Sequence, residues 1–432
     1  MTIEITKLSH DGRGVARDNA GKAIFIDGVL PGEHVEYTIT RSKRRFSEGV
    51  ATEITNPSAQ RVVAKCAHFL TCGGCSQQHI SSEAQLASKQ QSLIEQLEHF
   101  GQVRPANIAQ PLTGPLWGYR NKARLGVRYV IKKSKVLVGF RERYKNYLAE
   151  LDQCEILNPK IGLLITPLKQ LISTLAAYAE IAQVEVAVGD ERMALIFRNM
   201  VVLTDDDKQK LIDFAAQHDF DLYLQPGKPE TIYKLWPKDG IERLHYELPD
   251  YNLKLAFYPL DFTQINPALN RKMIAQAIAW LQLNSDDRVL DLFCGLGNFT
   301  LAMATIAAQV TGVEGATTMV ERGDENARLN NISNVDFHAA DLTGEHQNAT
   351  WARKNHYTKL LLDPPRTGAA EILPLIYGLG VSMILYVSCN PATLARDSGI
   401  LTQQYGYKLA NIGIMDMFPH TLHVEIMALF TR

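Results

Sequence analysis

The chain has 432 residues, of which 46% are hydrophobic, and its formal net charge is −1. This length allows two or three domains with buried cores, and the near-neutral charge excludes nucleic-acid binding through bulk charge, so such a partner would need a local basic patch. The first residues lack a basic segment followed by an apolar one, and the longest near-apolar run, 372–387, is broken by one proline and two glycines, so we expect a cytoplasmic protein with no membrane partner.

Residues 1–55 are predicted to form a small all-β module. Three short segments, 22–26, 35–40 and 49–54, have strand composition and are separated by Gly and Pro turns. Between the last two lies Arg41-Ser42-Lys43-Arg44-Arg45-Phe46, with four positive charges beside an aromatic ring. Such a run is usually a solvated face. On a small β-barrel it is also a common means of gripping RNA, and we favour RNA binding.

A group of cysteines follows this module. Cys66, Cys72 and Cys75 lie within ten residues, and Cys154 lies far downstream. The two glycines between Cys72 and Cys75 allow the backbone to fold tightly around a metal centre. Six Cys in a chain of this size argue for metal binding or catalysis rather than a disulfide framework. Four thiolates suit either zinc or an iron–sulfur cluster. Because structural zinc sites usually present two close pairs, the spacing favours the cluster.

The next segment, 82–101, is predicted to be a helix. Ser82 and Gln85 have the spacing of a capping box, and Gly101 is a helix stop. The residues expected to face a core are Leu86, Leu93, Ile94 and Leu97.

Residues 118–145 are strongly basic. They hold ten Lys or Arg against one acidic residue, a net +9, with four aromatic residues interleaved. Arg120, Lys122 and Arg124 alternate, so on a strand they would line one face. This mixture suits phosphate neutralisation and base stacking. The alternative is a solvated sheet face, which the excess charge makes the poorer interpretation.

Residues 150–250 are predicted to form a mixed α/β region in which no chemistry can be recognised. Residues 161–175 are predicted to be helical, and 184–188 with 194–197 to form a hairpin.

From about 262 onwards, strands alternate with helices, which predicts a doubly wound parallel sheet. Strand 288–293 leads into Gly295 and Gly297, where a nucleoside-bearing ligand can approach the backbone. A second strand ends at Glu314, about twenty residues on, placed for ribose hydroxyls. Thr300 replaces the third glycine of the dinucleotide fingerprint. This argues against a pyrophosphate and for a nucleoside cofactor such as S-adenosylmethionine.

Two further carboxylates follow strands of this sheet. Asp341 follows strand 334–338, where an adenine contact would lie, and Asp363 ends the fourth strand at the ligand-binding edge. Cys294 is interpreted as a small residue that fills a tight turn.

The apolar run 381–387 is predicted to be a buried strand, and Asn390 and Pro391 to begin a helix that ends at Gly406. Cys389 lies in the turn between them, at the positive end of the helix dipole, which is expected to lower the thiol pKa and favour the nucleophilic thiolate. The alternative is a small buried hydrophobe.

Three motifs resemble the RNA uracil-C5-methyltransferase family. They are Asp363-Pro364-Pro365-Arg366, Ser388-Cys389-Asn390-Pro391 and Pro419-His420-Thr421-Leu422-His423-Val424-Glu425. With the four cysteines and an N-terminal module that resembles a TRAM domain, the chain is similar along its whole length to the 23S ribosomal RNA enzymes of this family. The first two motifs are specific, whereas the middle region matches loosely.

The resemblance implies Cys389 as nucleophile and Glu425 as base. It implies a [4Fe–4S] cluster on Cys66, Cys72, Cys75 and Cys154, and S-adenosylmethionine among Gln264, Phe293, Asn298, Glu314, Asp341 and Asp363. It also suggests a monomer that acts on uracil 1939 of 23S ribosomal RNA.

The chemistry agrees with these residue types. Uracil C5 is too weak a nucleophile to accept a methyl group unaided. A thiolate that adds at C6 moves electron density to C5, and the adduct is released once a carboxylate such as Glu425 removes the C5 proton. The target base must first be unstacked.

The expected fold class is α/β in three parts: an OB-like β-barrel of TRAM type (1–55), a mixed α/β domain with the iron–sulfur cluster (56–260) and a Rossmann-like class I methyltransferase domain (261–432). Helix 82–100 is expected to pack on the last. Alternatives are a tRNA uracil-C5-methyltransferase, a radical S-adenosylmethionine enzyme, disfavoured by five residues between the first two cysteines, and a non-catalytic RNA-binding protein.

Overall fold

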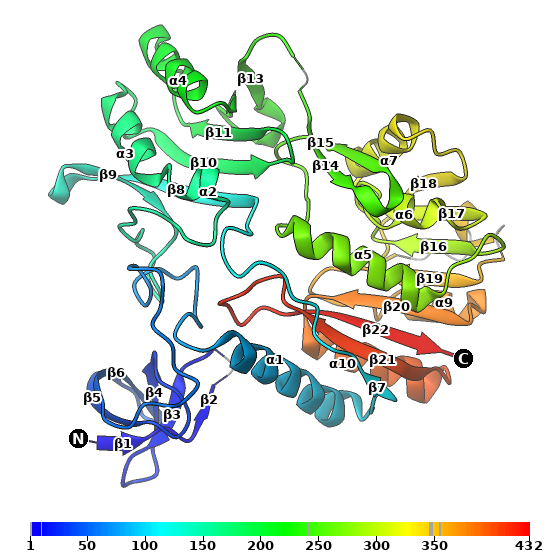
Figure 1. Cartoon of the computed structure of the whole chain (residues 1–432), viewed down its shortest axis with the longest axis horizontal. Helices are drawn as coiled ribbons and strands as arrows, with labels where there is room; N and C mark the ends of the chain where they lie inside the picture. The colour runs from blue at the N-terminus through cyan, green and yellow to red at the C-terminus, as the bar shows by residue number, and fades with distance from the viewer. Residues whose placement is uncertain (1, 10, 241, 345–348, 354–355) are drawn as a thin grey trace.

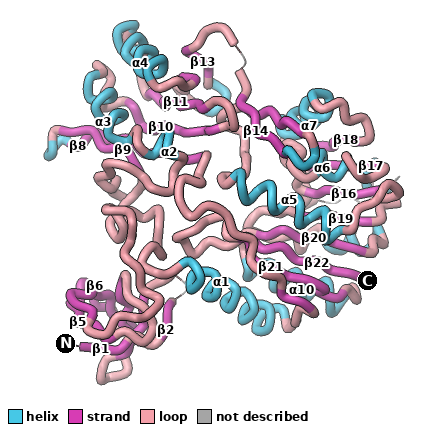
Figure 2. Tube along the Cα trace, viewed as in Figure 1, coloured by secondary structure: helices cyan, strands magenta, loops and turns pink. Residues whose placement is uncertain are grey.

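The computed structural model describes residues 2–9, 11–240, 242–344, 349–353 and 356–432. Its β-strands form three large sheets and one separate hairpin, and the sheets follow one another along the chain except for β7, which joins the last sheet (Figure 1). Much of the region where the three parts meet consists of loops rather than helices or strands (Figure 2). Within the described residues, the helices are all too short or too polar to cross a bilayer.

The N-terminal sheet has six strands in the order β1-β5-β6-β4-β3-β2. Its small core includes Ile24, Ile26 and Val35. The three strands expected from the sequence are confirmed as β4, β5 and β6, and three shorter strands precede them. The strands are β1 Thr2–Glu4, β2 Lys7–Leu8, β3 Gly14–Arg17, β4 Ala23–Asp27, β5 His34–Ser42 and β6 Phe46–Ile54.

The predicted helix is α1, Ser82–Gln96, which continues as a π-turn, Leu97–Gly101. The predicted capping box is wrong by one residue, because Ser81 is the N-cap and its hydroxyl accepts from Ala84 N (3.3 Å). Leu93 and Leu97 are buried in the C-terminal core, as expected. Strand β7, Asn107–Ile108, then pairs in parallel with β21, so the C-terminal sheet includes a strand from before residue 261.

The central sheet has the order β13-β12-β11-β10-β8-β9, with α3 and α4 packed on it. The predicted hairpin is confirmed as β10 and β11, and the predicted helix is split into α2 and α3. The elements are β8 Lys122–Val130, β9 Lys135–Gly139, α2 Pro159–Gly162, α3 Ile165–Thr174, β10 Ile181–Val188, β11 Met193–Asn199, α4 Asp205–Gln217, β12 Asp221–Leu224 and β13 Tyr233–Trp236, with 3-10 turns at Ile131–Lys133 and Pro229–Thr231.

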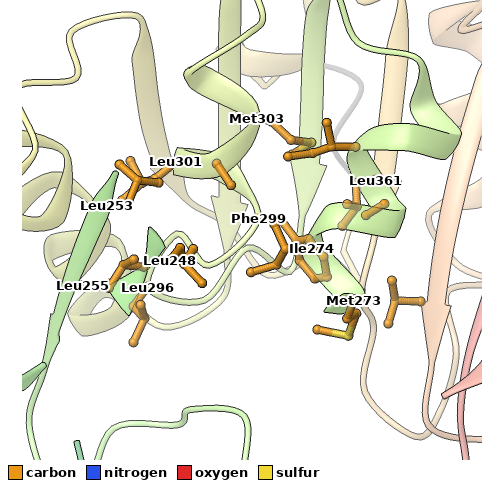
Figure 3. Packing of buried hydrophobic residues seen from close by; sticks show 14 of the residues in the cluster. Leu248, Leu253, Leu255, Met273, Ile274, Leu296, Phe299, Leu301, Met303 and Leu361 are labelled. Atoms are coloured by element: carbon orange, nitrogen blue, oxygen red, sulfur yellow. The ribbon is translucent and has the colours of Figure 1, made fainter. Parts of the chain in front are cut away.

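A hairpin of β14, Leu244–Leu248, and β15, Leu253–Phe257, follows the central sheet, with the 3-10 turn Pro249–Tyr251 at its tip. Leu248, Leu253 and Leu255 pack in the same buried cluster as Met273 and Ile274 (Figure 3). The hairpin therefore shares the core of the C-terminal part.

The C-terminal sheet has eight strands in the order β18-β17-β16-β19-β20-β22-β21-β7. Its strands are β16 Arg288–Leu292, β17 Gln309–Glu314, β18 Val335–Ala339, β19 Lys359–Leu362, β20 Met383–Ser388, β21 Lys408–Met415 and β22 Glu425–Thr431. Its helices are α5 Pro267–Leu281, α6 Thr300–Ala304, α7 Thr317–Leu329, α8 Thr350–Arg353, α9 Leu373–Leu379 and α10 Pro391–Gly399, the last extended by a π-turn, Ile400–Gln404.

The expectation of a parallel sheet holds for the five strands from β18 to β20. It is wrong for β22, which is antiparallel to both β20 and β21. The physical reason is the connection: nine residues, 416–424, join β21 to β22, whereas a parallel pair needs a crossover of a dozen or more residues.

Candidate active site

Cys389 lies in the turn between β20 and α10, as the sequence predicts. Asn390 is the N-cap of α10, where its Oδ1 accepts from Ala392 N (3.1 Å) and its Nδ2 donates to Arg366 O (2.9 Å). The side chain of Asn390 thereby ties the Cys389 turn to the loop that follows β19. The thiol itself is half-buried.

Glu425 is brought to the thiol by strand pairing. Ser388 lies opposite Ile426 in the antiparallel pair of β20 and β22. Cys389 follows Ser388 and Glu425 precedes Ile426, so both residues lie at the same end of this pair. Both side chains line one cavity of about 690 Å³, together with Asp363 and Arg366. The arrangement places a thiol and a carboxyl at the same end of the sheet.

Charge and loss of hydration raise the pKa values of these groups. Removal from water, together with the neighbouring Asp363 charge, raises the pKa of Glu425 to about 8. Removal from water and the Glu314 charge raise the pKa of Asp363 to about 7. The guanidinium of Arg366 opposes the shift at Glu425, and its Nη2 donates to His423 Nδ1 (3.1 Å).

The expected lowering of the Cys389 pKa is wrong. Loss of hydration raises the pKa of the thiol, and the negative charges of Glu425 and Asp363 raise it further, while Arg366 lowers it. The helix dipole acts within the first turn and is worth at most about 2 kcal/mol, and here desolvation and two carboxylates outweigh it.

The same cavity reaches the glycine turn after β16. Gly295 (φ +56°) and Gly297 (φ +94°) are both left-handed, and a Cβ at Gly297 would meet Leu301 at 3.2 Å. Glu314, at the end of β17, accepts from Gly295 N (3.1 Å) and Ala316 N (3.1 Å). The carboxylate at the end of β17 is therefore fixed beside the turn, where a ribose would be held.

Five of the six residues expected around the cofactor line this cavity: Gln264, Phe293, Asn298, Glu314 and Asp363. Asn298 is oriented by Tyr246, whose hydroxyl donates to Asn298 Oδ1 (2.8 Å), and by two hydrogen bonds with Asn270. Asp341 is not among the described residues that line the cavity. Its Oδ1 accepts from Thr343 N (3.0 Å) and Thr343 Oγ1 (2.7 Å) within its own loop.

Sequence reasoning missed several residues of the site. Tyr246 and Phe262 line the cavity. Asp291 was also missed, although a buried carboxyl group in the apolar strand β16 is a signal that could have identified it. Asp291 is buried and accepts from Thr300 Oγ1 (2.6 Å), which explains why Thr300 stands where a third glycine could have been. Burial raises the pKa of Asp291 to about 8.

Cys66, Cys72, Cys75 and Cys154 line one small cavity of about 20 Å³. Its other walls include Phe69, Phe140, Leu151 and Ile156. Gly73 packs closely against the backbone, since a Cβ would lie 3.1 Å from Arg141 O, so a side chain there would require a small displacement. Burial raises the pKa of Cys75 to about 12 and of Cys154 to about 11, and nearby thiols add to both shifts. Within the part of the chain described, three or more His, Cys, Asp or Glu side chains nowhere converge as a single metal ion requires.

The three alternating cations of the basic segment do not form the row of exposed charges that the sequence predicts. Lys122 Nζ is buried and has no hydrogen-bond partner among the described residues, and burial lowers its pKa to about 8. Arg124 is open to solvent and pairs with Glu185 (3.2 Å) on β10. Arg120 precedes β8 and donates from Nε to Lys122 O (2.9 Å). Strand alternation correctly placed Lys122 and Arg124 on one face of β8, but it did not predict that the Lys122 ammonium group is buried.

Comparison with known proteins gives matches over the whole chain. Residues 82–432 match the family model described as tRNA (Uracil-5-)-methyltransferase, and residues 1–52 match the TRAM domain. A curated relative from Hahella chejuensis, "23S rRNA (uracil(1939)-C(5))-methyltransferase RlmD", is 51% identical, with 100% of this chain and 97% of the relative covered. The protein of the same name from Alcanivorax borkumensis is 50% identical, with 99% and 96% covered.

Among solved structures, the chain is similar to the Pyrococcus abyssi tRNA (uracil-54, C5)-methyltransferase in complex with S-adenosyl-L-homocysteine. The TM-score is 0.75 at 23% identity, and 100% of this chain and 99% of that chain are covered. At this identity the likeness establishes the fold alone.

Proposed function

The chain belongs to the RNA uracil-C5-methyltransferase family, and we propose that it transfers a methyl group from S-adenosylmethionine to C5 of uracil 1939 in 23S ribosomal RNA. The observation that carries the proposal is that one cavity is lined by Cys389 and Glu425 and also by Gly295 and Glu314. The rRNA substrate rests on relatives of this name that are 50–51% identical over nearly their full length.

Cys389 begins the reaction in this proposal. Its thiolate adds to C6 of the uracil and forms a C–S bond, which leaves an enolate with electron density at C5. Because the pKa of Cys389 is raised in the free protein, the thiol must give up its proton, which passes to water, before it adds to the uracil. Arg366 favours this loss, since its positive charge stabilises the thiolate.

S-adenosylmethionine, when bound, supplies a methyl group on a sulfonium that the C5 carbon can attack. Gln264, Phe293, Asn298, Glu314 and Asp363 would hold it, because they line the cavity that also includes Gly295 of the glycine turn. Asp341 would join this set only if its loop were rearranged, because its carboxylate accepts from Thr343 N within that loop.

Glu425 completes the reaction. Once C5 is methylated, Glu425 accepts the C5 proton, the C6–S bond breaks, and the Cys389 thiolate is restored. A base with a pKa near 8 matches a proton transfer at neutral pH.

We further propose that the four cysteines hold a [4Fe–4S] cluster. Four thiols that face one cavity with largely apolar walls, and a glycine pair that brings Cys72 and Cys75 together, are the donor set such a cluster requires. In this position the cluster would fix the loops around residues 66–78 and 154.

The alternative substrate within the family is a tRNA. The N-terminal sheet does not distinguish an rRNA substrate from a tRNA substrate, because the fold of the Pyrococcus tRNA enzyme matches this chain over its whole length. Mapping of 5-methyluridine in both RNA pools of a deletion strain tests the proposal. We expect loss at position 1939 of 23S ribosomal RNA and intact tRNA; loss confined to tRNA would overturn the rRNA assignment.

A further inference from the structure

The loop between β21 and β22, residues 416–424, projects from the C-terminal sheet towards the N-terminal half of the chain (Figure 1). It ends at Glu425, and Phe418, His423 and Val424 line the cavity with it. The conformation of this loop therefore sets where the proposed base lies.

One side chain of α1 fixes the middle of this loop. Gln85 is 2% exposed, and its Oε1 accepts from His420 N (2.9 Å). Its Nε2 donates to Gln77 O (3.0 Å) and Ile80 O (2.8 Å). The amide of Gln85 thus joins the loop before Glu425 to the segment that follows Cys75.

The same segment binds the other side of the His420 residue. Ser76 N and Gln77 N both donate to His420 O (2.9 Å each). His420 has φ +66°, a left-handed conformation that costs a residue with a Cβ roughly 1 kcal/mol or more. Its ring stacks on Trp117, with centroids 4.0 Å apart and planes at 25°. The surrounding groups hold this residue in an unfavourable conformation.

A buried ion pair fixes the start of the loop. Lys89 lies one turn beyond Gln85 on α1, and its Nζ contacts Asp416 Oδ1 at 2.7 Å and Phe418 O at 3.3 Å. Lys89 and Asp416 are both almost completely buried. Two adjacent turns of α1 therefore hold two points of the loop.

We propose that Gln85 is a positioning residue for Glu425, acting through the His420 turn and coupling the Cys75 segment to removal of the C5 proton. This inference rests on the proposed function. A general base must lie within hydrogen-bond reach of its proton, whereas Cys389 is placed by β20 and α10, which Gln85 does not hydrogen-bond. Loosening the His420 turn should thus slow removal of the C5 proton by Glu425 and leave the addition of Cys389 to C6 unchanged.

The test compares three variants of α1 in single-turnover assays on RNA with ordinary uridine. Gln85→Met removes all of these hydrogen bonds, Gln85→Glu keeps the acceptor for His420 N, and Gln91→Met is the matched control, since Gln91 is exposed on the same helix and bonds to Glu95. Denaturing electrophoresis follows formation and decay of the covalent RNA adduct. S-adenosylmethionine binding and thermal melting verify the fold.

We expect Gln85→Met to form the adduct at the wild-type rate and to resolve it roughly 10- to 100-fold more slowly, so that the adduct accumulates. Gln85→Glu should be at least as slow, because its carboxylate keeps the acceptor for His420 N but turns an acceptor oxygen towards Gln77 O and Ile80 O, whereas Gln91→Met should be normal. If Gln85→Met does not fold, Gln85→Glu alone must show slower decay with unchanged formation. Equal slowing of both steps, or normal decay in a folded variant, would overturn the inference while leaving the proposed function intact. A wild type that forms no adduct would overturn both.

Discussion

Cys389 directly follows Ser388 and Glu425 directly precedes Ile426, so the two residues flank the last pair, Ser388–Ile426, of two antiparallel strands. Residues that face each other in such a pair have their Cβ atoms about 4.5–5.5 Å apart, so side chains of this length can reach one small ring. The nucleophile and base of the proposed reaction act on adjacent carbons of uracil. Strand register therefore brings the backbone positions of the two residues together.

The first prediction separates the two residues by step. Cys389→Ala should bind S-adenosylmethionine, transfer no methyl group and form no adduct, even with RNA that carries 5-fluorouridine. Glu425→Gln should add and methylate but not remove the C5 proton, so it should accumulate an RNA adduct that survives denaturing electrophoresis. The wild type should be trapped by the fluorinated RNA, because fluorine cannot leave as a cation. A Cys389→Ala enzyme that still methylates would end the mechanism.

The second prediction concerns Arg366 and pH. Its charge lowers the pKa of both Cys389 and Glu425, so its loss should raise both values, and the deprotonated forms should appear at higher pH. Arg366→Gln should therefore lose much more activity at pH 7 than at pH 9, whereas Arg366→Lys, which keeps the charge, should lose less at pH 7. A uniform loss across the pH range would show that Arg366 acts by contact rather than by charge.

The third prediction is that the proposed base destabilises the protein. The pKa of Glu425 is raised from its usual value of 4.5 to about 8, so the folded state binds the proton more tightly than the unfolded state. Stability is then lost as pH rises from about 4.5 to 8. Glu425→Gln should raise the free energy of unfolding at pH 9 by roughly 1–3 kcal/mol, with little effect near pH 4.5. Denaturant titrations can measure this. Glu321→Gln, an exposed change on α7, should be neutral, and an equal gain there would contradict the argument.

Local features of the fold were predictable from the sequence. The parallel strands β16, β19 and β20 are largely buried and appear as mainly apolar runs, and the Asn390–Pro391 cap is chemistry between neighbouring residues. The Cys389 turn, the glycine turn and the close grouping of Cys66, Cys72 and Cys75 follow from such signals, whereas the approach of Cys154 depends on the fold. The strands β1 to β3 are too short to carry a pattern of their own.

Features that depend on distant partners were not predictable. Lys89 and Asp416 are 327 residues apart, and nothing near either one indicates the pair. The raised pKa of Cys389 depends on Glu425 and Asp363, which only the folded sheet places nearby. Alternation identified the face of Lys122, whereas its burial depends on the surrounding fold.

The fourth prediction tests the cluster. Protein prepared without oxygen should be brown and contain about four irons per chain if the four thiolates hold one cubane. Cys72→Ser should lower the iron content and, because the Cys75 segment holds His420, should also slow adduct decay while sparing S-adenosylmethionine binding. Cys294→Ser, a buried thiol beside the glycine turn, is the matched control and should keep its iron. Colourless protein with stoichiometric zinc would contradict the assignment.

The fifth prediction is that RNA contacts the tip between β5 and β6 of the N-terminal sheet more strongly than it contacts β8. Lys43, Arg44 and Arg45 are exposed at the tip between β5 and β6, whereas Lys122 is buried and Arg124 is paired with Glu185. Reversing Arg44 and Arg45 together should weaken RNA binding and reduce the slope of log affinity against log salt by about 2.

The matched control for this change is a double reversal of Lys208 and Lys210 on α4, which lies at the opposite end of the molecule from the N-terminal sheet (Figure 1). Affinity and salt slope should be unchanged in this variant, because its charges are far from the tip. Equal losses in both doubles would mean that RNA responds to net charge rather than to a site. If the slope of log affinity against log salt were unchanged in the Arg44 and Arg45 double variant, the tip would be a solvated face without RNA contacts. The RNA contacts would then have to lie elsewhere, and the exposed Arg124 would be the next residue to reverse.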